Sequence, residues 1–581
     1  MRARRLIVPL TLSLTFVGCK REIVKETSGP DPTVTFETEV PPTDSETEIP
    51  PLETAETGET ETETEPVETG EPGPLWSDAT LTPSGVVVGA GARLPLRLRA
   101  TARGGVRTTP STVGWVSSDL AVASVVDGVL VANGPGTVTV TARFDGFEVP
   151  TTITVADDDA LRVRVIDVDT GAPVVDAEIT IGQDEYPVRT DKAGAVVVEG
   201  VSPEPLTLSV LGTGFVSMTM VEVVSRDLTV AVRSLAAAQA EVPVASGLVD
   251  MDDLSAGVSE VAVGIVGPTF TGSPYWFDWS DIVGPAREIT MLGVNVMLPS
   301  NVVIQDNNES WGLTLPSGTY AFWSLATVLP LAEALAAGNG DGDAFSLVAA
   351  HLDEALWGVI GPVEVTDYGL AGPLPLVAEP NSSTLVVTPA RPDFAEGTEN
   401  ALVLALGSRD EGLVTVGLGT GFGGVTVRHV ASPAPERVLG LYQQSFLGSG
   451  MGTSVTTAPV VDGTATLPAW IDIPQAPTLY GLSKEIRFNA DPDAQIVVAT
   501  MYDREGHIRD FYAPAGVELV DLPTLKAPFN FTVSDWSVRV LALDVGCYEQ
   551  AISSGAINEA ALGDDTVGAG IWGGSVVPLE S

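Results

Sequence analysis

The stretch GWVSSDLAVASVVDGVLVANGPGTVTVTARF, residues 114–144, is the part of the sequence that decides the fold. Between residues 137 and 142, valine or alanine alternates with threonine. The same alternation occurs upstream in residues 93–100, where leucine or alanine alternates with arginine or proline. An alternation of period two describes antiparallel strands with one buried face. Gly128 lies between two such runs and supplies a turn, so these residues predict a sandwich of two facing sheets.

Three motifs follow one another here: Trp-Val-Ser-Ser-Asp at 115–119, Val-Ala-Ser-Val at 122–125 and Gly-Pro-Gly-Thr at 134–137. In this order they resemble the group 2 bacterial immunoglobulin-like domain, and the resemblance covers residues 76–155. It implies an antiparallel β-sandwich. Within it we expect Trp115 to be a buried core anchor rather than part of a ligand site.

The next segment, residues 158–235, opens with the alternating run Leu161-Arg162-Val163-Arg164-Val165 and contains Thr190-Asp191-Lys192-Ala193-Gly194. It resembles the carboxypeptidase regulatory-like, transthyretin-like sandwich. We expect the Thr-Asp-x-x-Gly sequence to form a hairpin turn in which Gly194 takes a positive φ. The resemblance implies a domain that is not itself catalytic.

The first residues have the pattern of an export signal. Residues 1–5 carry three arginines, and Leu6 to Val17 form a largely apolar run that is too short to span a bilayer stably. We therefore expect residues 1–18 to be a signal peptide. Phe16-Val17-Gly18-Cys19 resembles the lipobox of bacterial lipoproteins, which implies that Cys19 is acylated and anchors the mature chain to a membrane. The alternative is an ordinary signal peptide cleaved near Gly18.

Lys20 follows the cysteine, where enterobacterial lipoproteins retained at the inner membrane carry aspartate. By that analogy we expect an envelope location at the outer membrane, on its periplasmic face or at the cell surface.

Residues 19–75 are dominated by Thr, Glu, Pro and Gly, as in Thr60-Glu61-Thr62-Glu63-Thr64-Glu65-Pro66. So few apolar residues cannot offset the entropy of an ordered chain, and we expect an extended, disordered acidic linker that acts as a spacer. The whole chain carries a formal net charge of −47. This charge repels phosphate backbones, so we expect no nucleic-acid partner.

The C-terminal half resembles no family, and we divide it into residues 236–430 and 431–581. Its runs of apolar residues separated by Pro and Gly are typical of antiparallel strands. A helical insertion is predicted from about Leu329 to Ile360, with its second part from Phe345 onwards. The overall prediction is a mainly β protein: tandem antiparallel β-sandwich modules after the disordered linker, then a β-rich region with a short helical insertion.

Candidate site residues are few. The cluster Tyr275-Trp276-Phe277-Asp278-Trp279 holds aromatic rings beside an acid, and Tyr275, Trp276 and Trp279 are a candidate ligand platform for sugar stacking; the alternative is core packing. The loops 306–309 and 339–343 are oxygen-rich candidates for Ca²⁺, with polar turns as the alternative. Neither has the spacing of an EF-hand.

The sequence offers poor material for catalysis. His351 and Glu354 fit the His-x-x-Glu that supplies two zinc ligands in carboxypeptidases, with His429 or His507 as a third. Against a zinc site, a helical pattern surrounds His351 and no substrate-binding arginine motif accompanies it. The glycines 419, 421 and 424 match Gly-x-Gly-x-x-Gly, but a strand follows them instead of a helix, so they predict a turn. Cys547 has no histidine nearby in the sequence.

We therefore expect no metal, cofactor or catalytic residue. The function predicted from the sequence is that of a lipid-anchored envelope protein with a non-enzymatic binding, adhesion or scaffold role and a glycan or protein ligand. The alternative is a secreted metal-dependent hydrolase with an unrecognised site in residues 236–581.

Overall fold

A computed structural model describes residues 76–576, with several gaps. Cys19, the acidic linker and the aromatic cluster Tyr275, Trp276 and Trp279 lie outside the described residues, as do both candidate Ca²⁺ loops. The gaps are 103–106, 111, 183–186, 240–242, 271–286, 292–293, 306–309, 316, 339–343, 353–354, 367, 371–376, 379–382, 393–400, 411, 447–449, 476–477, 481–484, 488–493, 503–506, 515, 518, 522–535, 545–546 and 555–567.

Residues 76–155 form three small sheets around one core, to which Val224 also contributes. Val138, Val140 and Ala142 are at most 1% exposed, as their alternation with threonine predicts. Trp115 is partly buried and packs against this core, in agreement with its prediction as a core residue. The strands are β1 (Trp76–Thr82), β2 (Val87–Val88), β3 (Arg93–Pro95), β4 (Arg97–Ala102), β5 (Arg107–Thr108), β6 (Gly114–Ser117), β7 (Ala123–Val126), β8 (Val129–Ala132), β9 (Gly136–Phe144) and β10 (Phe147–Val155).

Residues 161–238 contribute seven strands and one short helix. One sheet has the order β14-β11-β17, and Gly194 takes φ +71° in the turn before β14. A Cβ there would lie 2.5 Å from the carbonyl oxygen of Val165, so the turn requires glycine, as the sequence predicts. The prediction of a hairpin is wrong, because the strands on either side of this turn, β13 and β14, belong to different sheets. The elements are β11 (Leu161–Asp167), β12 (Glu178–Ile181), β13 (Val188–Arg189), β14 (Ala195–Val198), β15 (Leu206–Leu211), β16 (Ser217–Val223), β17 (Asp227–Val232) and α1 (Leu235–Ala238).

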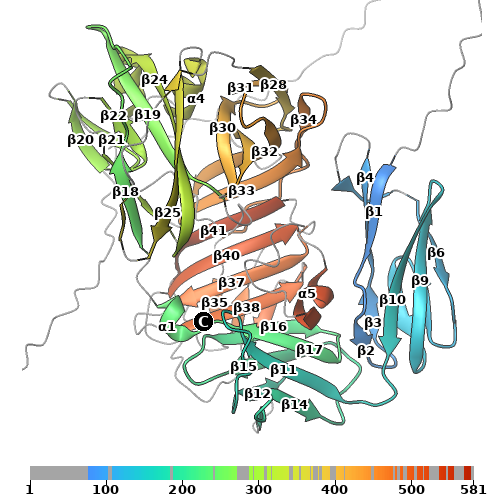
Figure 1. The fold of residues 1–581 in the computed structure, drawn as a ribbon. Helices are drawn as coiled ribbons and strands as arrows, with labels where there is room; N and C mark the ends of the chain where they lie inside the picture. Colours follow the sequence, from blue (N-terminus) through green and yellow to red (C-terminus); the bar gives the residue numbers. More distant parts are fainter. Residues whose placement is uncertain are drawn as a thin grey trace, which may run out of the picture. The chain divides into compact units, whose positions relative to one another are not determined.

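The second sheet of this region continues into the C-terminal strands. Within the described residues it has fifteen strands in the order β13-β12-β15-β16-β38-β37-β40-β41-β33-β32-β29-β30-β31-β28-β34 (Figure 1). The remaining strands are β28 (Ser383–Thr388), β29 (Leu402–Arg409), β30 (Gly412–Thr420), β31 (Val425–His429), β32 (Pro435–Phe446), β33 (Gly450–Pro459), β34 (Thr464–Thr466), β37 (Ile496–Tyr502), β38 (Ile508–Pro514), β40 (Trp536–Asp544) and β41 (Gly568–Val576), and helix α5 (Tyr548–Ser554) follows β40.

The joint within this sheet is the ladder between β16 and β38, which run parallel from the pair Ser217–Arg509 to the pair Met220–Tyr512. It connects residues about 290 positions apart in the sequence. Further along the sheet, β29 pairs with both β30 and β32, so the backbone ladder crosses residues 430–431, where we placed a boundary. The domain boundaries remain predictions.

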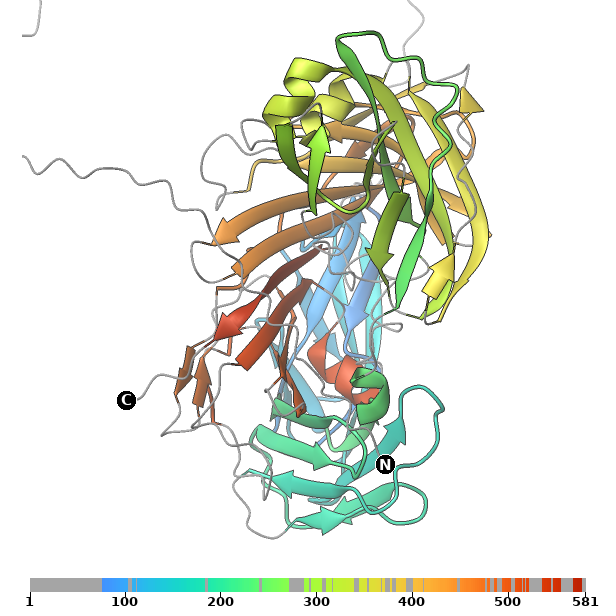
Figure 2. The ribbon, with the colours of Figure 1, turned by 90° about the vertical axis from the view of Figure 1, so that its left-hand side faces the viewer.

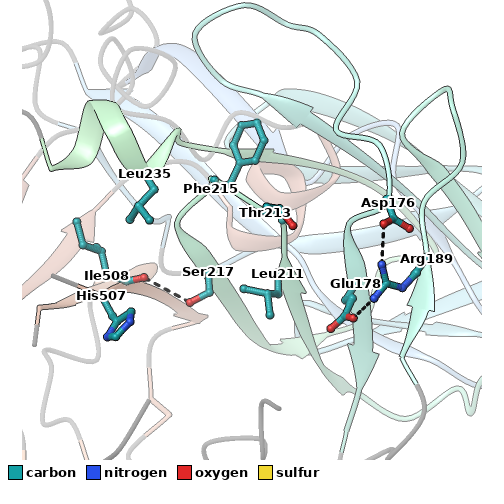
Figure 3. A pocket seen from close by; sticks show the side chains of 12 residues that line it. Asp176, Glu178, Arg189, Leu211, Thr213, Phe215, Ser217, Leu235, His507 and Ile508 are labelled. Carbon is teal, nitrogen blue, oxygen red and sulfur yellow. Dashed lines mark hydrogen bonds and ion pairs between the residues drawn. The ribbon is translucent and has the colours of Figure 1, made fainter. Parts of the chain in front are cut away.

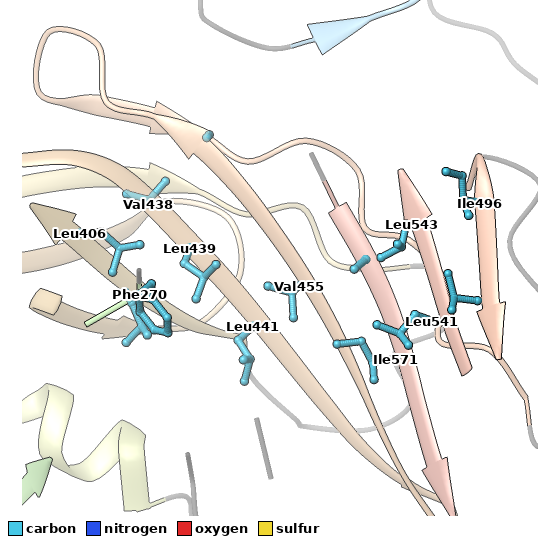
Figure 4. Packing of buried hydrophobic residues seen from close by; sticks show 14 of the residues in the cluster. Phe270, Leu406, Val438, Leu439, Leu441, Val455, Ile496, Leu541, Leu543 and Ile571 are labelled. Carbon is cyan, nitrogen blue, oxygen red and sulfur yellow. The ribbon is translucent and has the colours of Figure 1, made fainter. Parts of the chain in front are cut away.

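Aliphatic side chains fill the space beside the large sheet. Figure 4 shows this packing, with Phe270 from a different segment inserted among the leucines and valines of the C-terminal strands. Several strands bury nearly every residue, as β37 does from Ile496 to Met501. Strands covered on both faces read as continuous apolar runs rather than as alternation. The labelled members in Figure 4 are Phe270, Leu406, Val438, Leu439, Leu441, Val455, Ile496, Leu541, Leu543 and Ile571.

Residues 244–378 form two further sheets, β23-β18-β26 and β22-β19-β24-β25-β27, and a hairpin, β20-β21. Figure 2 shows the two helices α3 and α4 beside these strands. The elements are β18 (Val244–Leu248), β19 (Glu260–Pro268), β20 (Arg287–Met291), β21 (Val294–Leu298), β22 (Val302–Ile304), β23 (Ser310–Thr314), β24 (Gly318–Pro330), α3 (Leu331–Gly338), α4 (Ala344–Ala350), β25 (Leu356–Val365), β26 (Tyr368–Leu370) and β27 (Val377–Ala378); β35 (Thr478–Tyr480), β36 (Glu485–Arg487) and β39 (Leu519–Asp521) make one more small sheet.

The helical insertion is shorter than predicted. Helix α4 ends at Ala350, and Leu356 to Ile360 belong to β25, so a helix from Phe345 to Ile360 is wrong beyond its first half. The apolar residues at the start of β25 do not alternate with polar ones, so the sequence pattern cannot distinguish this strand from a buried helix. The mainly β prediction is confirmed, and in the described part of the chain every helix is too short or too polar to cross a membrane.

Candidate functional site

A pocket of about 310 Å³ lies where residues 176–235 meet the start of β38. Figure 3 shows that the labelled side chains come from both sides of this joint. The turn between β15 and β16 supplies the middle of the wall, α1 supplies Leu235, and His507 and Ile508 come from the C-terminal side. The lining residues are Asp176, Glu178, Arg189, Leu211, Gly212, Thr213, Gly214, Phe215, Ser217, Leu235, His507 and Ile508.

One wall of the pocket is an ion-pair cluster. Arg189 Nη1 donates to Asp176 Oδ2 at 2.7 Å, and its Nη2 donates to Glu178 Oε1 (Figure 3). The hydrogen bond that Arg189 donates to Asp176 is the main cause that raises the pKa of Arg189. The side chains of Arg189 and Asp176 are exposed, at 51% and 68%, and that of Glu178 is partly exposed, at 26%, so the cluster contributes little to stability. The two carboxylates hold the Arg189 guanidinium in place, and the three side chains together give this wall one net negative charge.

The opposite wall rests on the β16–β38 joint. Ser217 Oγ donates to the carbonyl oxygen of Ile508 at 3.4 Å (Figure 3). One residue further along β38, Arg509 is 1% exposed, donates to Thr219 Oγ1 at 2.7 Å and lies 4.8 Å from the Phe511 ring centroid. Burial lowers the pKa of Arg509 to about 9. A guanidinium remains protonated at neutral pH all the same, so the joint holds a buried cation.

The next residue of β38, Asp510, is a buried acid whose side chain points to the other face of the sheet. It is 2% exposed and accepts hydrogen bonds from Arg233 Nη2 at 2.9 and 3.1 Å and from Thr500 Oγ1 at 2.8 Å. Arg233 follows β17, so the bond connects that part of the chain to β38 directly. Polar side chains and backbone pairing thus hold the pocket wall in place.

The pocket has the chemistry of a binding site. Leu211, Phe215 and Leu235 give it apolar surface, and the ion-pair cluster and His507 give it polar groups that can orient a ligand. The described cysteine, Cys547, is not among its lining residues, and burial raises the pKa of its thiol to about 11. This thiol is therefore protonated at neutral pH and is a poor nucleophile.

The histidines of the zinc hypothesis have other partners. His351 Nδ1 lies 3.0 Å from the carbonyl oxygen of Leu347, and His429 Nδ1 lies 2.7 Å from that of Val430. Glu354 lies outside the described residues. Among the residues that the structure describes, no group of three or more His, Cys, Asp or Glu side chains could hold a metal ion.

The glycine motif is a turn, as predicted. Gly421 and Gly423 take positive φ values of 127° and 79°. Strand β31 then begins at Val425. The helix N-terminus that would bind a pyrophosphate is therefore missing at this position.

Sequence reasoning did not single out Asp176, Glu178 or Arg189, and it considered His507 only as a zinc ligand. These residues lie in ordinary polar turns and strand ends, where charged side chains are common. Only the pairing of β16 with β38 brings His507 to the pocket, and no local pattern encodes a pairing over that distance.

No family model and no curated protein matches the sequence. The solved structures with distant similarity include an S-layer protein, pilus proteins and alpha-2-macroglobulins of bacteria. Domains 5–6 of the S-layer protein SbsC share 16% identity at a TM-score of 0.14, over 43% of this chain and 91% of that one. The Bacillus anthracis TIE protein shares 8% identity at a TM-score of 0.13, over 69% of this chain and 75% of that one. BcpA, the major pilin subunit of Bacillus cereus, shares 9% identity at a TM-score of 0.10, over 53% of this chain and 97% of that one. At these TM-scores the likeness concerns β-rich character alone.

Proposed function

We propose that this chain is a lipid-anchored protein of the cell envelope that works as a scaffold or adhesion protein and performs no catalysis. In this proposal Cys19 carries the lipid, the acidic linker holds the β-rich part away from the membrane, and the pocket beside His507 contacts a glycan or a protein. The linker composition and the export signal support the location.

The observation that carries the proposal is the β16–β38 ladder. Four consecutive residue pairs, from Ser217–Arg509 to Met220–Tyr512, join strands from two distant parts of the chain into one sheet. Separating them requires several backbone hydrogen bonds to break together, since the strands lie side by side along the whole ladder. A joint of this kind suits a protein that keeps its shape under load.

The test compares cells that make the full chain with cells that lack it. Adhesion to immobilised glycans and proteins, and sensitivity of the envelope to detergent, are the two readouts. The proposal predicts a loss in at least one of them, restored by the full chain. Unchanged adhesion and unchanged detergent sensitivity in the cells that lack the chain would contradict a scaffold or adhesion role.

The anchor has a separate test. In Cys19→Ser the thiol that accepts the lipid is gone, so the chain is expected to move from the membrane fraction to the soluble fraction and to lose incorporation of labelled fatty acid. Cys547→Ser is the matched control and is expected to remain in the membrane fraction. Equal partitioning of the Cys19→Ser and Cys547→Ser chains would overturn the lipid anchor.

A further inference from the structure

The N-terminal sandwich, residues 76–155, is closed by a ladder between the start and the end of its chain. β1 leads directly into β2, which lies in a different sheet. β2 runs parallel to the last strand, β10, with Val87 opposite Thr154 and Val88 opposite Val155. In the part of the sandwich that the structure describes, the other ladders are antiparallel. The parallel pair is therefore the exception, and it joins the two strands through which the chain enters and leaves.

Hydrogen bonds along residues 83–88 hold this contact together. The backbone bonds run from Gly85 N–H to Thr152 O at 2.8 Å, from Thr154 N–H to Val86 O at 3.0 Å and from Ala156 N–H to Val88 O at 2.8 Å. The hydroxyl of Thr151, which is 2% exposed, donates to the carbonyl oxygen of Pro83 at 2.6 Å. These bonds follow one another along the strand axis, so a force along that axis acts on all of them at once.

The chain enters and leaves this sandwich at opposite ends of its strands. Trp76 Nε1 donates to Asp145 Oδ2 at 2.8 Å, and the Trp76 ring lies 5.9 Å from the ring of Phe144, so β1 begins beside the turn between β9 and β10. From that turn β10 runs for nine residues to Val155. At about 3.3 Å per residue, the exit lies about 30 Å from the entry. Figure 1 shows β1, β2 and β10 side by side in this sandwich.

Residues 161–238 repeat the arrangement with a different strand order. Their first strand, β11, runs parallel to their last strand, β17, from the pair Arg162–Asp227 to the pair Asp167–Val232. β11 is also the central strand of its sheet, between β14 and β17. Because the two strands are parallel, the chain again enters at one end of the ladder and leaves at the other. Two successive regions thus share this feature although their sheets are built differently.

The direction of a pull decides how such a ladder fails. When parallel strands are pulled from opposite ends, they slide along each other, and all the bonds between them share the force and break together. When a hairpin is pulled from the two strand ends on one side, it opens one bond at a time. The first case has the higher barrier, and forced unfolding is governed by the rate of crossing that barrier.

We propose that the ladders β2–β10 and β11–β17 carry tension: they transmit, in the sliding direction, the pull between a membrane anchor at the N-terminus and a partner held by the rest of the chain. Tension that arrives from the linker reaches the sandwich at Trp76 and passes through residues 76–155 before any other folded segment. An anchor and a partner supply the two ends of the load, so the proposal rests on the proposed function.

Single-molecule pulling on the full chain tests this directly. Cys19→Ser and Cys547→Ser remove both native thiols, so introduced cysteines are the only attachment points. The pair Ser77→Cys and Asp157→Cys pulls the sandwich from its entry and its exit, along the strands. The pair Thr137→Cys and Asp157→Cys pulls β9 and β10 apart from one end, because Thr137 is opposite Thr154. The three attachment sites are exposed.

At equal loading rate, the pull from Ser77 and Asp157 is expected to need at least about twice the force of the pull from Thr137 and Asp157, because several ladder bonds break together. Equal forces, or a higher force for the hairpin, would overturn the proposal. The measurement needs neither a membrane nor a ligand. A weak ladder in a chain whose loss still impairs adhesion or detergent resistance would therefore remove the tension-bearing role and leave the scaffold or adhesion role in place.

Thr151→Val assigns the resistance to the ladder itself. The substitution keeps the size of the side chain and removes one of the four bonds between residues 83–88 and β10, so the force from entry to exit is expected to fall by about a quarter. The force that opens the hairpin should not change. Thr139→Val, at an exposed threonine of β9, is the matched control and should leave both forces unchanged. An equal fall in both directions of pulling would mean general destabilisation and would count against the ladder.

Discussion

The β16–β38 joint and a second joint at helix α5, the α5 joint, connect distant parts of the same chain in different ways. The first is a backbone ladder of four residue pairs. The second depends on single side chains, with Glu549, Tyr548 and Gln550 each bonded to a backbone group of another segment. A ladder uses groups that every residue except proline carries, so it tolerates side-chain changes and does not titrate. A side-chain joint can be broken by one substitution.

The two joints also differ in how they manage buried charge. Beside the ladder, Asp510 meets Arg233 and Thr500 at hydrogen-bond distance. In the α5 joint, Arg226 is directed to a carbonyl oxygen instead of to the carboxyl group beside it. At the ladder the buried carboxylate is therefore paired with a cation, whereas at the helix it accepts backbone N–H groups, and the following changes should separate the two cases.

The largest effect is expected from Phe511→Pro. β38 lies between β16 and β37 in the sheet. Proline has no backbone N–H, so the ladder to one of these two neighbours loses a hydrogen bond. The expected loss is about 3 kcal/mol or more of stability, and cooperative thermal unfolding of the full chain measures it. Phe511→Leu keeps the N–H and tests the side chain alone. If both variants lost the same stability, the ladder would not be the main element of the joint.

Asp510→Asn should have the next largest effect. The substitution keeps the shape of the side chain but removes the carboxylate that pairs with the partly exposed Arg233. We expect the free energy of unfolding, measured with denaturant, to fall by about 2–3 kcal/mol. Ser217→Ala, which removes only a long hydrogen bond of 3.4 Å at the same joint, is the control and should cost much less. Comparable losses in the two variants would mean that the charge of Asp510 contributes nothing beyond an ordinary hydrogen bond.

The strands with one exposed face were predictable, and those with two covered faces were not. Val138 and Val140 stand in a period of two that a single sequence displays, and both are buried. The run from Leu356 to Ile360 is apolar without a period, so it was read as a helix although it forms β25. The segment 93–100, read as one alternating run, is divided between β3 and β4, which belong to different sheets.

The candidate site was out of reach for a different reason. His507 and Arg189 meet in the pocket only because β16 pairs with β38, and that pairing depends on the packing of the whole sheet. Glu549 lies in a seven-residue helix with no strong sequence pattern. Motif searches directed attention to His351 and to the glycines 419–424, because those residue types carry known chemistry even where the fold gives them none.

Asp544→Asn tests a separate ion-pair contact, between the end of β40 and β4, with a smaller expected effect. Asp544 pairs with Arg97 at 3.1 Å and with Arg99, and the three side chains are 10–23% exposed. We expect a cost of about 1–2 kcal/mol in thermal unfolding. Glu148→Gln breaks the pair with Arg143, where both side chains are more than half exposed, and should change stability by less than about 0.5 kcal/mol. Equal effects of the two substitutions would show that burial does not strengthen the Asp544 pairs.

Arg189→Ala should leave stability almost unchanged, because its ion pairs with Asp176 and Glu178 are open to solvent. Its effect should instead fall on binding, since the change removes the one cation of the pocket wall and leaves two carboxylates that repel each other. Screening of the full chain on glycan and protein arrays measures it, with Arg143→Ala as the control for loss of an exposed arginine elsewhere. Loss of a ligand in Arg189→Ala but not in Arg143→Ala would assign that ligand to the pocket. Equal retention in both would place the binding surface elsewhere on the chain and leave the pocket as a by-product of the β16–β38 joint.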